Sequence, residues 1–362
     1  MKNRVIWTIP RFLEAKTGGI RYHSEVLAWL READWDVLAC SMPVAAGPSR
    51  LRRNLLSNLT LARAVLSEAR PRDIVVEVSD HHAKLLLANA LLRLRGVRTV
   101  AICHHLSHHD LVPDGRFRVR AFKAADRFIE ALFFRTADRV IAVSSTTRDE
   151  ILALGISPRK VAIVPNGVDR PPPVVAPARD ARPRALFVGS VCRRKGLTHL
   201  VAAAALLKDT GVVVDCVGPP DDEEYLRRLQ DQVSSSGLEH SVRFHGLVSR
   251  EQLWEFYARA DIFVLPSLWE GWGVVLMEAM SFSIPIVVSR AGATTELVAD
   301  GENGLIVPPG DTAALADAIR KLVGDPGLRK RLGRNGKMRF RQSPTWEQVG
   351  QRFGQALSQL EM

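Results

Sequence analysis

The chain has 362 residues, of which 46% are apolar and 25% are charged, as expected for a globular protein long enough to form two domains. The absence of any run of about 18 uncharged apolar residues excludes a membrane-spanning helix. The net charge is +11, and residues 1–168 hold most of the excess, with 26 Lys and Arg against 16 Asp and Glu. A basic first half suits an anionic partner, whether a membrane, a nucleic acid or an acidic substrate.

The first apolar run, Val5–Pro10, is too short for a signal peptide and indicates a buried first strand, so we expect a cytoplasmic protein. Further β-branched runs of strand length follow, separated by helical patterns such as Leu51, Leu55, Leu59, Ala62 and Leu66. This alternation predicts a parallel sheet covered by helices on both faces. The strands expected in the first half are Val5–Ile9, Val37–Ala39, Ile74–Val78, Val97–Cys103, Val140–Val143 and Val161–Val164.

Prolines at 171–173, 177 and 183 interrupt the alternation and predict a stiff linker at 169–183. The pattern then restarts, and Ser249 and Gln252 have the spacing of a capping box at the start of a helix. We therefore expect an α/β protein of two Rossmann-like, doubly wound domains, at 1–168 and 184–342, facing each other across a cleft. A helix at about 343–362 is a candidate for packing back on the first domain. The strands expected in the second half are Ala185–Val188, Val212–Val217, Val242–His245, Ile262–Leu265, Ile286–Ser289 and Gly304–Val307.

Four cysteines lie far apart without a Cys-x-x-Cys pair, so we expect free thiols in a reducing compartment: Cys40, Cys103, Cys192 and Cys216. Neither half opens with Gly-x-Gly-x-x-Gly, which counts against a dehydrogenase-type dinucleotide site. Ligands of doubly wound sheets bind beyond the carboxyl ends of the strands. The candidate functional residues are therefore those that follow strands.

One candidate anion site follows the first strand of each half of the chain. Gly18 and Gly19 open a helix, where backbone N–H groups can approach a phosphate, although an ordinary strand-to-helix turn would have the same sequence. Arg193, Arg194 and Lys195 provide three consecutive cations, which suit phosphate oxygens but are also common in solvated basic loops.

The segment Pro266–Met280 contains two acidic residues in an unusual setting. Glu270 precedes Gly271 and Gly273, which indicates a loop leading to a helix N-terminus, and Glu278 would lie inside that helix within an apolar run. A carboxylate among Leu, Met and Ala needs hydrogen-bond donors. Sugar hydroxyls are such donors, and backbone N–H groups in a purely structural arrangement are the alternative.

Histidines cluster after the fourth strand, at His104, His105, His108 and His109, with Asp110 beside them. Imidazoles are good metal ligands, but this segment follows a strand without an established helix to hold their spacing. A single functional histidine, a metal site and incidental surface histidines all remain open, and we favour the first.

These motifs together resemble the signature of family 4 glycosyltransferases, which have the GT-B fold. Glu270 and Glu278 are separated by seven residues, matching that family's E-x7-E motif. The match runs from about Gly18 to Val307 and includes, in order, the segments 137–144, 164–169, 194–196 and 303–305.

The resemblance implies a role for each matching residue. Lys195 and Arg194 would bind the diphosphate of a UDP- or GDP-sugar donor, together with the N–H groups of Gly18 and Gly19. Glu278 would accept hydrogen bonds from the ribose hydroxyls. Glu270, followed by Gly271 and Gly273, would contact the transferred sugar. His104, with His105 as the neighbouring alternative, would lie near the reacting sugar.

The sequence departs from the family at Ser190, where an arginine often follows the glycine, so Arg193 or Arg194 would have to replace that cation. Family 4 enzymes retain the anomeric configuration, and we expect departure and attack on the same face of the sugar. Cations already placed at the leaving phosphate would stabilise the transition state, so no metal ion or other cofactor is expected.

A glycan or lipid-linked acceptor, in cell-surface polysaccharide or glycolipid synthesis, is the expected second substrate. The helix expected at 116–135 interleaves basic and aromatic residues, which would suit a peripheral contact with anionic lipid at the inner face of the membrane, or packing on its own sheet. The alternatives to transfer are a nucleotide-sugar epimerase, a sugar phosphorylase and a non-catalytic nucleotide-binding subunit. No nucleic-acid-reading module is recognisable, so we expect no nucleic-acid partner.

Overall fold

All twelve apolar runs form strands in the computed structural model, which describes residues 4–9, 18–41, 50–78, 85–109, 117–172 and 182–360. Contacts group Met1–Gly167 with Pro344–Met362 as unit 1, and Val168–Ser343 as unit 2. Residues 173–181 of the predicted linker lie outside the described residues. Within the described ranges, no helix combines the length and the apolar character needed to cross a bilayer.

The described strands of unit 1 form a parallel sheet in the order β2-β1-β3-β4-β5-β6. The chain runs from β1 outward to β2, returns to β3 on the other side of β1, and then continues outward to β6. The strand order therefore reverses between β1 and β3, and this boundary is a topological switch point. The strands are β1 (Arg4–Ile9), β2 (Asp36–Ser41), β3 (Ile74–Val78), β4 (Arg98–Cys103), β5 (Arg139–Ala142) and β6 (Val161–Ile163).

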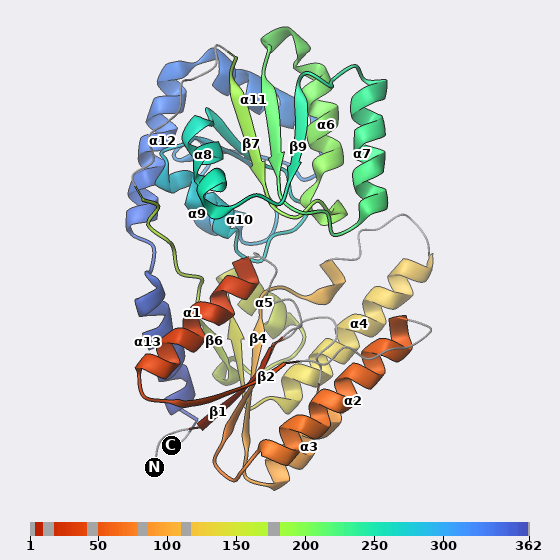
Figure 1. Ribbon diagram of the computed structural model, residues 1–362, viewed down its shortest axis with the longest axis vertical. Coiled ribbons are helices and arrows are strands. Elements are labelled where there is room, and N and C mark those ends of the chain that lie inside the picture. Colours follow the sequence, from red (N-terminus) through yellow and green to blue (C-terminus); the bar gives the residue numbers. More distant parts are fainter. Residues whose placement is uncertain are drawn as a thin grey trace. The chain divides into compact units, whose positions relative to one another are not determined.

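Helices cover both faces of this sheet, as its apolar strands require. Successive side chains of a strand point to opposite faces. Trp7 of β1 meets Phe353 of α13 at 5.3 Å between ring centroids, whereas Ile6 packs with Leu61 of α2 and Leu92 of α3. Figure 1 shows α1 beside α13, and α2, α3 and α4 together. The helices of unit 1 are α1 (Gly18–Glu32), α2 (Arg50–Glu68), α3 (Leu86–Leu94), α4 (Phe117–Thr136), α5 (Ser145–Ala153) and α13 (Trp346–Ser358).

Helix α13 packs closely on α1 because two glycines leave room for an indole. A Cβ atom on Gly350 would lie 2.1 Å from Cγ of Trp29, and one on Gly354 would lie 2.7 Å from the same ring. The indole N–H of Trp29 also donates to Glu347 at 3.2 Å. The last helix of the chain thus belongs to the first unit.

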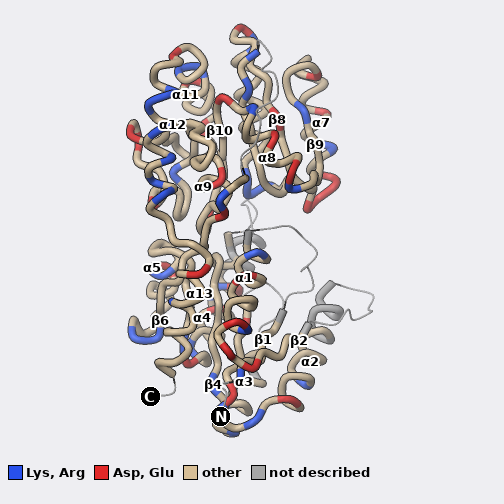
Figure 2. Tube along the Cα trace, turned by 60° about the vertical axis from the view of Figure 1, so that its left-hand side comes forward, with Lys and Arg blue, Asp and Glu red and all other residues tan. Residues whose placement is uncertain are grey.

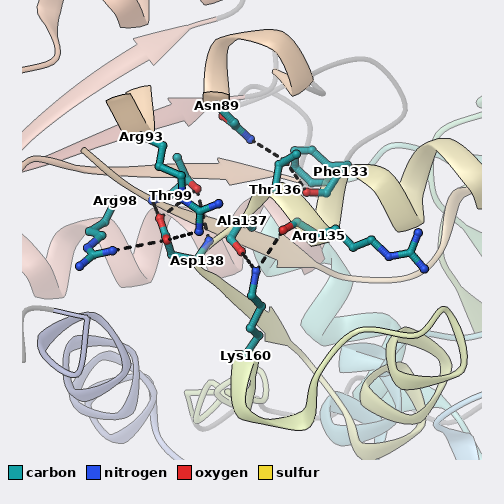
Figure 3. Close-up of polar contacts among 10 residues, drawn as sticks. All are labelled: Asn89, Arg93, Arg98, Thr99, Phe133, Arg135, Thr136, Ala137, Asp138 and Lys160. Carbon is teal, nitrogen blue, oxygen red and sulfur yellow. Dashed lines mark hydrogen bonds and ion pairs between the residues drawn. The ribbon is translucent and has the colours of Figure 1, made fainter. Parts of the chain in front are cut away.

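Polar contacts fix the carboxyl end of α4 to the sheet (Figure 3). Asp138 accepts a hydrogen bond from the backbone N–H of Thr99 in β4 at 2.9 Å and pairs with Arg93 of α3 at 3.2 Å. The Lys160 ammonium donates to the carbonyl of Arg135 at 3.0 Å, which suits the negative end of a helix dipole. These bonds attach the end of α4 and the turn after it to β4, to α3 and to the segment before β6.

The described strands of unit 2 form a second parallel sheet, in the order β12-β11-β10-β7-β8-β9. The chain again runs outward from β7 to β9 and returns beside β7 with β10, so the switch point lies between β7 and β10. The strands are β7 (Arg184–Val188), β8 (Val213–Val217), β9 (Val242–Gly246), β10 (Ile262–Leu265), β11 (Ile286–Ser289) and β12 (Gly304–Val307).

Helices α11, α6 and α7 pack side by side in unit 2, and α12 packs against α9 (Figure 1). The capping box predicted at Ser249 and Gln252 is present, with both reciprocal hydrogen bonds, and begins α8. The helices of unit 2 are α6 (Leu197–Leu206), α7 (Glu223–Ser235), α8 (Arg250–Arg259), α9 (Val274–Ser281), α10 (Thr294–Leu297), α11 (Thr312–Gly324) and α12 (Pro326–Arg341).

Candidate functional site

The switch point of unit 2 brings together two residues that are far apart in the sequence. Lys195 ends the short 3-10 turn that follows β7, and Glu270 lies in the loop that follows the adjacent strand β10. The Lys195 ammonium donates to Oε1 of Glu270, and Nη1 of Arg194 lies 3.7 Å from the same oxygen. The predicted cations and the first predicted carboxylate are therefore in contact.

Glu270 is only 5% exposed, so its charge depends on these partners. The Ser267 hydroxyl donates to the same Oε1 at 3.3 Å, and the Arg194 guanidinium also donates to the carbonyl of Trp269 at 3.0 Å. Arg193 differs, because its guanidinium lies over the ring of Tyr225, 5.2 Å from the centroid. Of the two arginines weighed as replacements at Ser190, only Arg194 accompanies Lys195.

Backbone contacts hold the β7 and β10 loops against each other. Gly196 has a φ of +70°, and a Cβ atom there would lie 2.1 Å from the carbonyl oxygen of Pro266. The N–H of Leu268 donates to the carbonyl of Arg194 at 2.7 Å. Only glycine combines this close approach with a left-handed conformation, so Gly196 allows the two loops to meet.

A second glycine holds the β10 loop from the other side. Gly292 follows β11 with a φ of +61°, and a Cβ atom there would lie 2.0 Å from the carbonyl oxygen of Glu270. The next residue, Ala293, donates its N–H to that oxygen at 2.9 Å. The position of Glu270 is thus set by loops from three adjacent strands.

The glycines after Glu270 lead into a helix, as the sequence predicted. Gly271 is buried, and Gly273 is the N-cap of α9 with a φ of +95°, although no side chain caps this helix. Glu278 lies in the second turn of α9 and is 7% exposed.

Two side chains of α8 satisfy the Glu278 carboxylate. Arg250 approaches Oε1 at 3.0 Å, and the Tyr257 hydroxyl donates to Oε2 at 2.8 Å. Burial raises the pKa of Glu278 above its ordinary value, and Arg250 acts in the opposite direction. Burial and the adjacent carboxylate raise the pKa of Tyr257 well above 10, so this phenol remains a donor. Side chains, rather than backbone N–H groups, therefore compensate the buried charge.

In unit 1, the glycines at the start of α1 lie near one of the predicted histidines. Helix α1 begins at Gly18, and Thr17 lies outside the described residues. A Cβ atom on Gly19 would lie 3.7 Å from the ring of His104, which follows β4. Nε2 of His104 is 2.9 Å from Nε2 of His23, a buried residue of α1. Burial and the neighbouring His104 lower the pKa of His23 well below 6.5, so His23 is neutral.

The other described histidines of the cluster differ in their surroundings. His109 pairs with Glu150 of α5 at 2.8 Å, His105 is half-buried beside His104, and the side chain of His108 lies outside the described residues. Among the described residues, no group of three or more His, Cys, Asp and Glu side chains could hold a metal ion.

Comparisons with known proteins agree with the resemblance to family 4 glycosyltransferases. The model named Glycosyltransferase Family 4 matches residues 36–170, and the model named Glycosyl transferases group 1 matches residues 174–339. Alpha-maltose-1-phosphate synthase from Mycolicibacterium smegmatis is 30% identical over 370 residues, covering 92% of this chain and 93% of the relative. The chain belongs to glycosyltransferase family 4.

Solved structures show that this glycosyltransferase has the GT-B fold. Sucrose-phosphate synthase from Thermosynechococcus elongatus superimposes with a TM-score of 0.86 at 23% identity, over 99% of both chains. HepE from Anabaena, in complex with UDP-glucose, superimposes with a TM-score of 0.75 at 18% identity, over 98% of this chain and 99% of HepE. The predicted α/β class and fold are confirmed, as is the prediction of a transferase among the alternatives that the sequence left open.

Three residues that contact the candidate site of this glycosyltransferase were not predicted from its sequence. Arg250 lies between the two capping-box residues and was given no role, although it reaches Glu278. Gly292 and His23 were not singled out, because a lone glycine after a strand and a lone histidine in a helix carry weak signals. Their proximity to Glu270 and His104 comes from tertiary contacts between strands and helices distant in the sequence.

Proposed function

We propose that this glycosyltransferase transfers a hexose from a UDP- or GDP-sugar, with the diphosphate bound by Lys195 and Arg194. The observation that carries the proposal is the convergence of these cations with Glu270 at the switch point of unit 2. Doubly wound sheets bind their ligands at such points. A complex of the structural neighbour HepE with UDP-glucose supports the choice of donor class.

The proposed mechanism depends on charge at the leaving group. Breaking the bond between sugar and diphosphate leaves negative charge on the phosphate, and Lys195 and Arg194 would stabilise it without a metal ion or other cofactor. We propose that Glu270 contacts the transferred sugar and holds Lys195 in place before the donor binds. We propose retention of the anomeric configuration, as in family 4. Because none of the carboxylates that the structure describes is an evident nucleophile, we propose departure and attack on one face of the sugar.

The remaining predicted residues receive their roles within the same proposal. Glu278 would accept hydrogen bonds from the ribose hydroxyls, because each carboxylate oxygen has a second lone pair beside those used by Arg250 and Tyr257. Gly271 and Gly273 would let the chain approach the donor. In unit 1, the N–H groups of Gly18 and Gly19 would contact phosphate, and His104 would contact the sugar.

A thermal-shift panel of UDP, GDP, ADP and their sugars, without added metal, tests the donor site. We expect one nucleotide to raise the melting temperature, because a ligand that binds only the native state stabilises it. The shift should disappear in Lys195→Ala and Glu278→Ala. No shift from any nucleotide at concentrations well above a typical binding constant would contradict the proposal.

We propose a glycan or lipid-linked acceptor in cell-surface polysaccharide or glycolipid synthesis, and a cytoplasmic enzyme that contacts anionic lipid peripherally. Basic and acidic residues are spread over both units (Figure 2), so the support comes from α4 rather than from overall charge. Three exposed apolar residues lie within five positions of α4: Phe128, Ile129 and Leu132 are 67%, 43% and 42% exposed. Arg127 is exposed beside them, as suits a helix face on lipid. The basic side chains of residues 118–123 lie outside the described residues.

The enzyme should sediment with phosphatidylglycerol vesicles at low salt. Phe128→Ser should weaken that binding by up to about 30-fold, because a buried aromatic side chain contributes roughly 2 kcal/mol and each 1.4 kcal/mol is a factor of ten. Leu206→Ser is the matched control, since Leu206 is a 52% exposed residue of α6 in unit 2. Equal binding by wild type and Phe128→Ser, or no binding at low salt, would remove the lipid contact from the proposal.

A further inference from the structure

Arg250 joins two carboxylates of unit 2 that are distant in the sequence. Its guanidinium lies 3.0 Å from Oε1 of Glu278 and 2.6 Å from Oδ2 of Asp169. Asp169 is near the start of unit 2, and Glu278 lies in α9. Arg250 itself is the first residue of α8.

The guanidinium is held in one orientation by a third contact. Its central carbon lies 4.0 Å from the centroid of the Trp254 ring, one helical turn further along α8. Trp254 is 7% exposed and lies against Phe282, with 5.7 Å between ring centroids. A planar guanidinium can stack on an indole and still offer N–H groups to two carboxylates, which an ammonium cannot.

Glu278 needs this cation because its surroundings oppose ionisation. The carboxylate is buried, and Asp169 adds a like charge nearby. The Tyr257 hydroxyl and Arg250 are the groups that favour the ionised form. Of these, only Arg250 brings a positive charge, so its loss would leave a buried carboxylate facing a second carboxylate.

We propose that Arg250 is a positioning residue, which keeps Glu278 ionised and oriented so that it can accept hydrogen bonds from the ribose of the donor. This inference rests on the proposed function, in which Glu278 binds the ribose. A neutral carboxyl group has lost one of its acceptor sites to a proton, and without Arg250 the Glu278 side chain has no ion pair to fix its rotamer. Arg250 then controls donor affinity without touching the donor.

The test measures the dissociation constant of a nucleotide between pH 6 and pH 9 by calorimetry. The probe is whichever of UDP, GDP and ADP binds wild type best. The variants are Arg250→Met, Arg250→Lys and Glu278→Gln. Glu278→Gln reports the titration of the nucleotide alone. Arg259→Met is the matched control, because Arg259 lies on the same helix and pairs with the exposed Glu255.

In Arg250→Met the pKa of Glu278 should rise further, since the charge that lowers it is gone. The ionised form exists above the pKa, so binding by this variant should be about tenfold weaker at pH 7 and should recover as the pH rises, one pKa unit being worth a factor of ten. Arg250→Lys should lie between Arg250→Met and wild type, and Arg259→Met should match wild type.

The outcomes separate this inference from the proposed function. Weak binding by Glu278→Gln with wild-type binding by Arg250→Met would overturn the positioning role and leave the donor site intact. A loss in Arg250→Met that is the same at every pH would overturn the claim that Arg250 keeps Glu278 ionised, because loss of ionisation alone recovers as the pH rises. Wild-type binding by Glu278→Gln would instead overturn the ribose role of Glu278 in the proposed function.

Discussion

Replacing Lys195 with alanine should lower turnover about 100- to 1000-fold, the usual cost of removing one preorganised donor from a developing charge. Lys195 is 13% exposed and contacts Glu270, so its ammonium is already placed before any donor binds. The loss should appear in kcat as well as in donor binding, because the leaving phosphate carries more charge in the transition state than in the bound donor. Steady-state kinetics with the preferred donor measure it.

Arg193→Ala is the matched control, since Arg193 belongs to the same turn but lies over Tyr225. It should keep turnover within a few-fold of wild type. Lys195→Arg, which retains the charge, should recover part of the loss. Because Glu270 is buried, the melting temperature of each variant must be recorded as well. Unchanged turnover in a folded Lys195→Ala enzyme would remove Lys195 from the mechanism.

Replacing Glu77 with glutamine should stabilise unit 1 at alkaline pH. Glu77 of β3 is 1% exposed, and burial raises its pKa from 4.5 to about 8, although hydrogen bonds from Asn89 and from the N–H of Leu85 oppose the shift. The folded state therefore binds more protons than the unfolded state between these values, so stability falls as the pH rises through this range. The cost at pH 8 is at most on the order of 4 kcal/mol.

In Glu77→Gln this dependence should disappear, raising the melting temperature at pH 8 by roughly 10 °C, with wild type and variant converging near pH 5. Calorimetric melts across that range provide the measurement. Glu68→Gln is the control, because the Glu68 side chain is 52% exposed and should not reproduce the effect. A Glu77→Gln variant less stable than wild type at pH 8 would mean that the ionised carboxylate is needed in the fold.

The strands could be predicted because both sheets are parallel and covered on both faces. Strands such as Ile262–Leu265 and Ile286–Ser289 are entirely buried. Strands buried on both faces appear in the sequence as continuous apolar runs, which are easy to recognise. Helix α8 could be predicted from its capping box, which is a local interaction. The order of the strands could not be read in this way, because it depends on which strands pair after long connections.

The residues of the candidate site also divide into those that local sequence signals identify and those that depend on long-range contacts. Glu270 and Glu278 were identified by their spacing, and Lys195 by its charge after a strand, so the candidate residues of the site were accessible from sequence. Arg250 and Gly292 act through groups that lie far from them along the chain. Their roles follow from the neighbourhood of α8, α9 and the β11 loop, which only the folded chain brings together.

Because α13 follows unit 2 in the chain but packs in unit 1, unit 1 is completed only after all of unit 2 has been synthesised. All elements of unit 2 are synthesised before α13 is. Trp7 and Tyr22 were made among the first residues of the chain, yet they contact Phe353 of α13. Unit 1 must therefore leave this side of its sheet exposed until α13 has been made, and a nascent chain stalled before residue 344 would present those aromatic rings to chaperones.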